Sequence, residues 1–179
     1  FISEAETWVN LGLHPHIAVV TNIEMDHPDC YADLACMREA YAQFLMGIPE
    51  GGWIVACADS PALRQTLREA GALRAGVVTY GREPGAECQI VDVATTTEGG
   101  TGFAVRRDGR EWLRAALAIP GEHNVLNATA ALLVIDLLGL DLHAGARALA
   151  EYRGVARRFQ VKGEAGGVTV VDDYAHHPT

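Results

Sequence analysis

The first 80 residues alternate between short apolar runs and helix-like segments, and this alternation limits the chain to few folds. Apolar runs occupy residues 17–20, 53–58 and 76–80. Between them, residues 33–46 place apolar side chains at helical intervals, and Pro61 opens a second helical segment that ends near Ala70. Strands that alternate with helices are typical of a parallel sheet covered by helices. We therefore predict an α/β fold with a parallel sheet.

The pattern changes after the third apolar run, where the chain becomes rich in strand-forming residues. The β-rich runs are Cys88–Ala94, Gly102–Arg107 and Glu111–Ile119. Asp108 and Gly109 form a good hairpin turn between the last two of them. We predict an antiparallel β-meander attached to the parallel sheet.

Helices and a second β unit complete the chain. The expected elements are helices Val125–Leu138 and Leu142–Glu151 and strands Gln160–Glu164 and Val168–Asp172. The helical layer stops before Gly154, where a glycine-led turn begins the new β unit. We therefore expect residues 1–153 to form one domain and residues 154–179 to begin another.

A polar cluster follows the first apolar run directly. It consists of Thr21, Asn22, Glu24, Asp26, His27 and Asp29. Ligands bind beyond the carboxyl ends of the strands in open α/β sheets. Carboxylates beside an imidazole suit a hard divalent cation such as magnesium. The alternative interpretation is a solvated loop with an Asp that caps the next helix.

Glu4 and Glu6 extend this hypothesis to the start of the chain. Residues 1–5 read as the tail of a strand, so Glu4 and Glu6 lie near its carboxyl end. If that strand and the run 17–20 are neighbours, Glu4 and His27 reach one edge of the sheet and can share a cation.

His123 and Asn127 are four positions apart at the start of a predicted helix, so they share one face. An imidazole can stack on a flat heterocycle, and a carboxamide can both donate to and accept from an adenine edge. The alternative is N-capping of this helix by His123 and Asn124, with Asn127 exposed.

Two groups near the C-terminus can bind anions or substrates. Arg157 and Arg158 follow the glycine turn and can clamp phosphate, or they form a surface pair at a domain edge. Asp173 and His176 follow the last predicted strand, where a role in a site competes with a structural or exposed role.

Net charge and cysteine usage exclude several classes of partner. The formal net charge is -9, which argues against a nucleic-acid-binding surface and against an anionic membrane partner. The four cysteines show no CxxC spacing and read as reduced thiols of a cytosolic protein. No apolar run approaches the roughly 18 residues that a membrane span needs. We therefore expect a cytoplasmic location.

The ends of the chain lead us to expect a fragment. Phe1 stands where Met starts a protein, and Thr179 follows a strand-like run closely. The chain has no G-x-x-x-x-G-K-[ST] motif, and its only lysine is Lys162. If this protein uses a phosphate-cradling loop, that loop is expected upstream of Phe1.

Four motifs together resemble the Mur ligases, the ATP-dependent amino-acid-adding enzymes of peptidoglycan synthesis. They are Thr21-Asn-Ile-Glu-x-Asp-His27, Gly121-x-His-Asn-x-x-Asn-Ala128, Arg157-Arg-Phe159 and Asp172-Asp-Tyr-Ala-His-His-Pro-Thr179. Within the family, the motifs are most similar to the branch that joins L-alanine to UDP-N-acetylmuramate. The nearest competitor is the branch that recycles a murein tripeptide, which typically has Leu where this chain has Phe159.

The resemblance implies a fold, a reaction and two cofactors. The fold is a P-loop-type parallel sheet flanked by helices, with the first strands of a C-terminal Rossmann-like domain. The reaction uses ATP and Mg²⁺ and passes through an acyl-phosphate, with UDP-N-acetylmuramate and L-alanine as substrates. Without the P-loop lysine, the fragment alone is expected to be inactive. A non-catalytic nucleotide-binding module with the same fold is the remaining alternative.

The resemblance also implies roles for single residues. Glu4 and His27 would bind magnesium, with Glu6 in reserve because the family commonly reads Glu-Ala-Asp-Glu here. The other roles are adenine binding by His123, Asn124 and Asn127, phosphate binding by Arg158, nucleotide binding by Asp173, and alanine or acyl binding by Tyr174 and His176. His27, Arg158 and His176 would take part in catalysis. The helix at 33–46 lacks the carbamoylated lysine of other Mur ligases, as expected of the alanine-adding branch.

Overall fold

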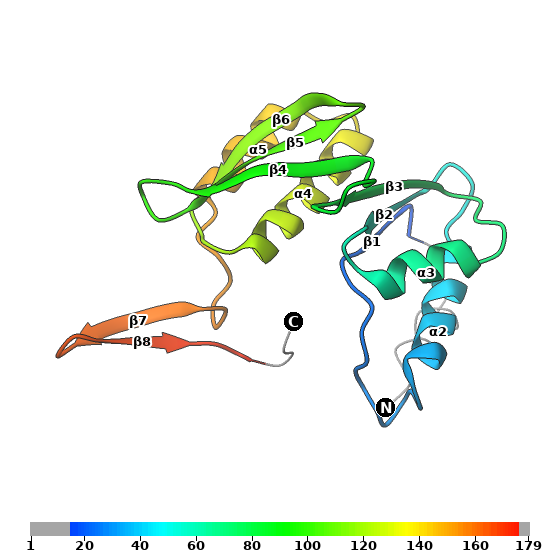
Figure 1. Cartoon of the computed structure of the whole chain (residues 1–179), viewed down its shortest axis with the longest axis horizontal. Coiled ribbons are helices and arrows are strands. Elements are labelled where there is room, and N and C mark those ends of the chain that lie inside the picture. The colour runs from blue at the N-terminus through cyan, green and yellow to red at the C-terminus, as the bar shows by residue number, and fades with distance from the viewer. Residues whose placement is uncertain (1–14, 176–179) are drawn as a thin grey trace.

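The computed structural model describes residues 15–175, which are organised around one mixed six-stranded sheet (Figure 1). Its strands are β1 Ile17–Val20, β2 Trp53–Cys57, β3 Gly76–Gly81, β4 Cys88–Thr95, β5 Thr101–Arg107 and β6 Arg110–Leu117. They lie side by side in chain order. The first four strands pair in parallel and the last three pair antiparallel. This confirms the predicted parallel sheet with an added meander.

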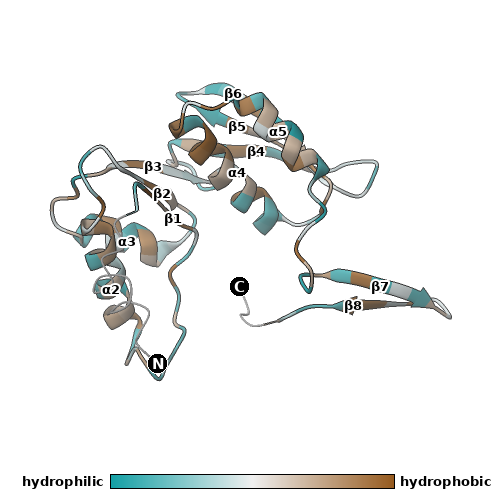
Figure 2. Cartoon of the chain, turned by 180° about the vertical axis from the view of Figure 1, so that it is seen from behind, coloured by the Kyte–Doolittle hydropathy of each residue, from teal (hydrophilic) through white to brown (hydrophobic). Residues whose placement is uncertain are grey.

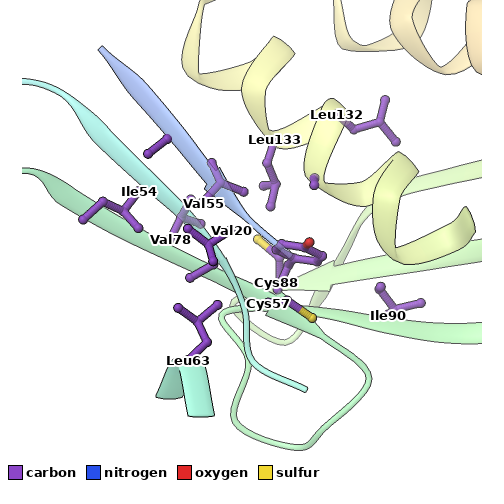
Figure 3. Close-up of a cluster of buried hydrophobic side chains, with 14 of the residues drawn as sticks. Val20, Ile54, Val55, Cys57, Leu63, Val78, Cys88, Ile90, Leu132 and Leu133 are labelled. Atoms are coloured by element: carbon purple, nitrogen blue, oxygen red, sulfur yellow. The ribbon is translucent and has the colours of Figure 1, made fainter. Parts of the chain in front are cut away.

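Helices cover both faces of this sheet. They are α2 Leu34–Met46, α3 Pro61–Glu69, α4 Glu122–Leu137 and α5 Leu142–Glu151. Figure 3 shows Leu63 of α3 and Leu133 of α4 on opposite sides of the strands. Both side chains are fully buried, together with Ile54, Val55 and Val78 of the sheet. Within residues 15–175, no helix is long and apolar enough to cross a membrane.

The helix starts follow from local chemistry. Asp33 caps α2 by accepting a 2.9 Å hydrogen bond from Cys36 N, as predicted. Ser60 caps α3, with Pro61 in its first turn. Helix α4 begins at Glu122, before the predicted Val125. The prediction placed the start too late because the first turn is polar and carries no apolar periodicity. Figure 2 shows this hydrophilic first turn and the apolar turns that follow it.

A separate hairpin follows the helices. Strands β7 Gln160–Ala165 and β8 Val168–Asp172 pair only with each other among the described residues. Several apolar side chains of this hairpin are exposed: Val161, Val168, Val170 and Val171. The change from the helical layer to a separate β unit agrees with a boundary near Gly154, which remains a prediction.

The four cysteines divide into two exposed and two buried thiols, which predicts two rates of modification. Cys30 and Cys36 are exposed, whereas Cys57 and Cys88 are buried in the sheet. Burial raises the pKa of Cys57, and it raises the pKa of Cys88 to about 11. Because the thiolate is the reactive form, these two remain protonated and slow at pH 8.

We expect Ellman's reagent at pH 8 to modify two thiols of the native chain rapidly and the other two only after unfolding. The Cys30→Ser/Cys36→Ser variant is the matched control and is expected to lose the rapid phase. Rapid modification of all four native thiols would contradict the buried positions.

Candidate functional site

The loop after β1 presents His27 to solvent in a defined conformation. His27 has a positive φ of 50°, and its side chain is 41% exposed. Its N–H donates to Asp26 Oδ1 at 2.8 Å, and its Nε2 lies 3.7 Å from Asp26 Oδ2. Its carbonyl oxygen accepts hydrogen bonds from the N–H groups of Cys30 and Tyr31 at 2.8 and 3.0 Å. The turn is therefore ordered by its own hydrogen bonds.

The same loop is tied to helix α3 through one hydroxyl. Ser60 Oγ accepts from Leu63 N at 3.3 Å, which caps α3, and also from Ile23 N at 3.3 Å. Ser60 is buried. Further along the loop, Asn22 Nδ2 donates to Glu24 Oε1. The polar cluster predicted beyond the first strand thus lies at the carboxyl edge of the sheet, held against the adjacent strand–helix connection.

The carboxylates and the imidazole of this loop are chemically suited to a magnesium ion whose remaining ligands come from substrate and water. Magnesium prefers oxygen ligands and is usually held by one or two protein carboxylates together with phosphates and water. Within residues 15–175, no group of three or more His, Cys, Asp or Glu side chains is arranged to hold a metal. Magnesium binding by His27 and its neighbouring carboxylates therefore stays a prediction. Glu4 and Glu6, its predicted partners, lie outside the described residues.

The start of α4 places the predicted adenine-binding residues together. Asn124 Nδ2 donates to Pro120 O at 2.7 Å, while His123 and Asn127 are exposed. The N-cap is Gly121, and it makes no side-chain capping hydrogen bond. The capping by His123 and Asn124 in the alternative interpretation is therefore wrong, because the helix begins at Glu122, before both residues, whereas the exposed position of Asn127 in that interpretation is confirmed.

Gly121 allows the ring of His123 to fold back over the helix start. Gly121 has a φ of 108°, and a Cβ atom there would lie 2.7 Å from His123 Cε1. A larger residue would displace the ring. The imidazole is therefore located above the first turn of α4, close to Asn124.

The third predicted group forms a compact turn at the base of the β7–β8 hairpin. Asp173 Oδ2 accepts from Phe159 N at 2.8 Å, and its Oδ1 accepts from Ala175 N at 2.7 Å. Tyr174 N donates to Arg157 O at 2.7 Å. These bonds join the Arg157–Phe159 turn to the segment after β8.

The carboxylate of Asp173 at the hairpin base is stabilised in its ionised form by its neighbours. The N–H of Ala175, followed by that of Phe159, holds the pKa of Asp173 below its ordinary value. The charges of Arg158 and His123 lower the same pKa further. The structure therefore joins Asp173 to the turn that carries Arg158, and it places His123, Asn124 and Asn127 at the start of α4. The hydrogen bonds described for His27 lie within its own loop, and His176 lies outside the described residues.

A network of hydrogen bonds and an ion pair, which the sequence did not reveal, also reaches the start of α4. Asp59 accepts hydrogen bonds from Arg82 N at 2.9 Å and Glu83 N at 3.0 Å. The guanidinium of Arg82 forms an ion pair with Glu122, the first residue of α4. A Cβ at Gly81 would lie 2.2 Å from Asp59 Oδ1, so only glycine permits this approach. No sequence motif signals the network, because its members are far apart in the chain.

Comparison with known proteins gives a family for this arrangement. The sequence of residues 3–135 matches the protein family described as the Mur ligase middle domain. The chain is 44% identical over 181 residues to the UDP-N-acetylmuramate–L-alanine ligase of Acidothermus cellulolyticus. The match covers 100% of this chain and 38% of that protein.

Two solved structures share the fold. UDP-N-acetylmuramate-alanine ligase of Thermotoga maritima has a TM-score of 0.77 and 28% identity, covering 97% of this chain and 37% of that one. The UDP-N-acetylmuramate:L-alanyl-gamma-D-glutamyl-meso-diaminopimelate ligase of Neisseria meningitides has a TM-score of 0.69 and 26% identity, covering 84% and 43%. The chain thus spans less than half the length of each of these relatives.

Proposed function

The chain belongs to the Mur ligase family, and from this we propose that it forms the central ATP-binding part of an enzyme that joins L-alanine to UDP-N-acetylmuramate. The observation that carries the proposal is the 44% identity, along the whole chain, to a relative with that named activity. We further propose that residues 1–153 belong to the central domain and residues 154–179 begin a C-terminal Rossmann-like domain. The proposed location is the cytoplasm.

In the proposed reaction, the muramoyl carboxylate attacks the γ-phosphorus of ATP and ADP leaves; the amine of alanine then attacks the acyl-phosphate, loses a proton and displaces phosphate. His27 and Glu4 would hold magnesium, which would supply positive charge near the phosphates. Arg158 binds a phosphate oxygen through its planar guanidinium. Because the transferring group is highly charged, positioning and charge neutralisation account for most of the catalysis.

The start of α4 supplies the proposed adenine contacts. The Asn124 amide nitrogen is already engaged with Pro120 O, so its Oδ1 is the atom that faces an incoming donor such as the adenine amino group. The exposed side chain of Asn127 makes no hydrogen bond within residues 15–175, so its amide offers both a donor and an acceptor. His123 presents an exposed ring for stacking. Asp173 orients the neighbouring turn, and Tyr174 and His176 are proposed to lie toward the alanine or acyl end.

The second candidate is the tripeptide-recycling ligase, which the similarity to the Neisseria structure favours. Phe159 after the paired arginines supports the alanine-adding branch instead. Phosphate release by the full-length protein with ATP, magnesium and UDP-N-acetylmuramate separates the two. We expect release that depends on L-alanine and is absent with the tripeptide.

Release with the tripeptide alone would transfer the function to the recycling branch. No release with either amine would favour a nucleotide-binding module without catalysis. The 179-residue chain is the negative control, because we expect no magnesium-dependent turnover from it.

A further inference from the structure

Two arginines lie against one tyrosine ring at the base of the hairpin. The Cζ atoms of Arg157 and Arg158 are 5.4 and 5.5 Å from the centroid of the Tyr174 ring. Both distances lie within the roughly 6 Å range over which a guanidinium is attracted to an aromatic face. One ring therefore contacts two consecutive cationic side chains.

The backbone holds this arrangement in an unusual conformation. Arg157, Phe159 and Ala175 have positive φ angles of 61°, 46° and 46°. Non-glycine residues adopt such angles rarely, and clusters of them persist where the surrounding structure enforces them. Here Asp173 and the hydrogen bond from Tyr174 N to Arg157 O enforce them. The turn thus fixes both arginines close to the tyrosine.

The two guanidinium charges are not neutralised by a salt bridge. Among residues 15–175, no carboxylate forms an ion pair with Arg157 or Arg158. The nearby Asp173 uses both of its oxygens to accept backbone N–H groups. Because the ionised Asp173 also interacts with Arg158, these three side chains leave one net positive charge at the turn, which an anion can neutralise.

We propose that Tyr174 is a positioning residue whose ring holds Arg157 and Arg158 together, so that both bind the nucleotide phosphates. This inference rests on the proposed function and adds two assignments to it. Arg157 becomes a second phosphate-binding residue. The ring of Tyr174 gains a role in positioning the two arginines, in addition to its proposed place toward the alanine or acyl end.

The test compares Tyr174→Phe and Tyr174→Leu in the full-length protein by calorimetric titration with ADP and magnesium, and by steady-state kinetics. Phe keeps the ring and removes the hydroxyl, whereas Leu removes the ring. We expect Tyr174→Leu to weaken ADP binding about three- to tenfold, the effect of losing two partly exposed cation–π contacts. Tyr174→Phe is expected to bind ADP much as the wild type does, and Tyr152→Leu, at the exposed end of α5, is the matched control.

A double-mutant cycle tests the coupling directly. Arg157→Gln is expected to weaken ADP binding, and the loss in Arg157→Gln/Tyr174→Leu is expected to be smaller than the product of the two single losses. Three results would each overturn the proposal. They are equal losses of ADP affinity in Tyr174→Phe and Tyr174→Leu, unchanged ADP binding by Tyr174→Leu, and a defect confined to the KM for L-alanine. Because ADP binding is measured without turnover, failure of the alanine-dependent reaction is recorded separately.

Discussion

Replacing His27 with alanine in the full-length protein is expected to lower alanine-dependent phosphate release by about a hundredfold or more, the usual effect of losing one stabilising group of a charged transition state. The loop after β1 orders His27 through its own hydrogen bonds, so the substitution removes the imidazole with little effect on the rest of the fold. If His27 binds magnesium, the variant also needs a higher magnesium concentration for half-maximal rate. Phosphate release measured across a magnesium titration checks both expectations.

His143→Ala is the matched control for this measurement. His143 is an exposed histidine on α5, and we expect its replacement to leave both the rate and the magnesium requirement unchanged. A His27→Ala protein with wild-type rate and wild-type magnesium dependence would remove His27 from the proposed metal site. A low rate with unchanged magnesium dependence would indicate a role other than metal binding.

Replacing Leu133 with alanine is expected to lower the free energy of unfolding by about 3 kcal/mol, within the range for a buried leucine that leaves a cavity. Leu133 is 1% exposed and lies between α4 and the sheet (Figure 3). The loss is a large share of the roughly 5–15 kcal/mol that stabilises a typical domain. Urea denaturation of the chain, followed by circular dichroism, measures the change.

Leu138→Ala supplies the control at the end of the same helix. Leu138 is 54% exposed, so its replacement is expected to change the free energy of unfolding by less than about 0.5 kcal/mol. Equal effects of the two substitutions would contradict the packing of α4 against the sheet. A selective loss in Leu133→Ala would show that the helix carrying His123 and Asn127 is held by its buried face.

The strands were predictable because burial leaves a direct mark on the sequence. The run Ile17–Val20 has the same bounds in the sequence prediction and in the structure, since a parallel strand covered by helices is apolar throughout. The Asp108–Gly109 hairpin was also predictable, because its turn chemistry is local. The start of α4 was placed too late, because Glu122 and His123 are polar and give no periodic signal.

The candidate site was predictable only where its residues are close in sequence. The shared face of His123 and Asn127 follows from helical spacing alone. The link from Asp59 to Arg82, and from Arg82 to Glu122, depends on how strands and helices pack, and no local pattern encodes it. The binding and catalytic roles assigned to all of these residues stay predictions, and Glu4, Glu6 and His176 lie outside the described residues.

The bond from Ile23 N to Ser60 Oγ has a consequence for the dynamics of the chain. A single buried hydroxyl closes the first turn of α3 and also holds the loop that leads to His27. Opening of either segment therefore breaks a hydrogen bond of the other, and the two behave as one cooperative unit of local unfolding. Each time the first turn of α3 frays, the loop after β1 that carries His27 therefore loses one of its hydrogen bonds. The stability of the proposed metal-binding loop thus depends on the stability of this helix turn.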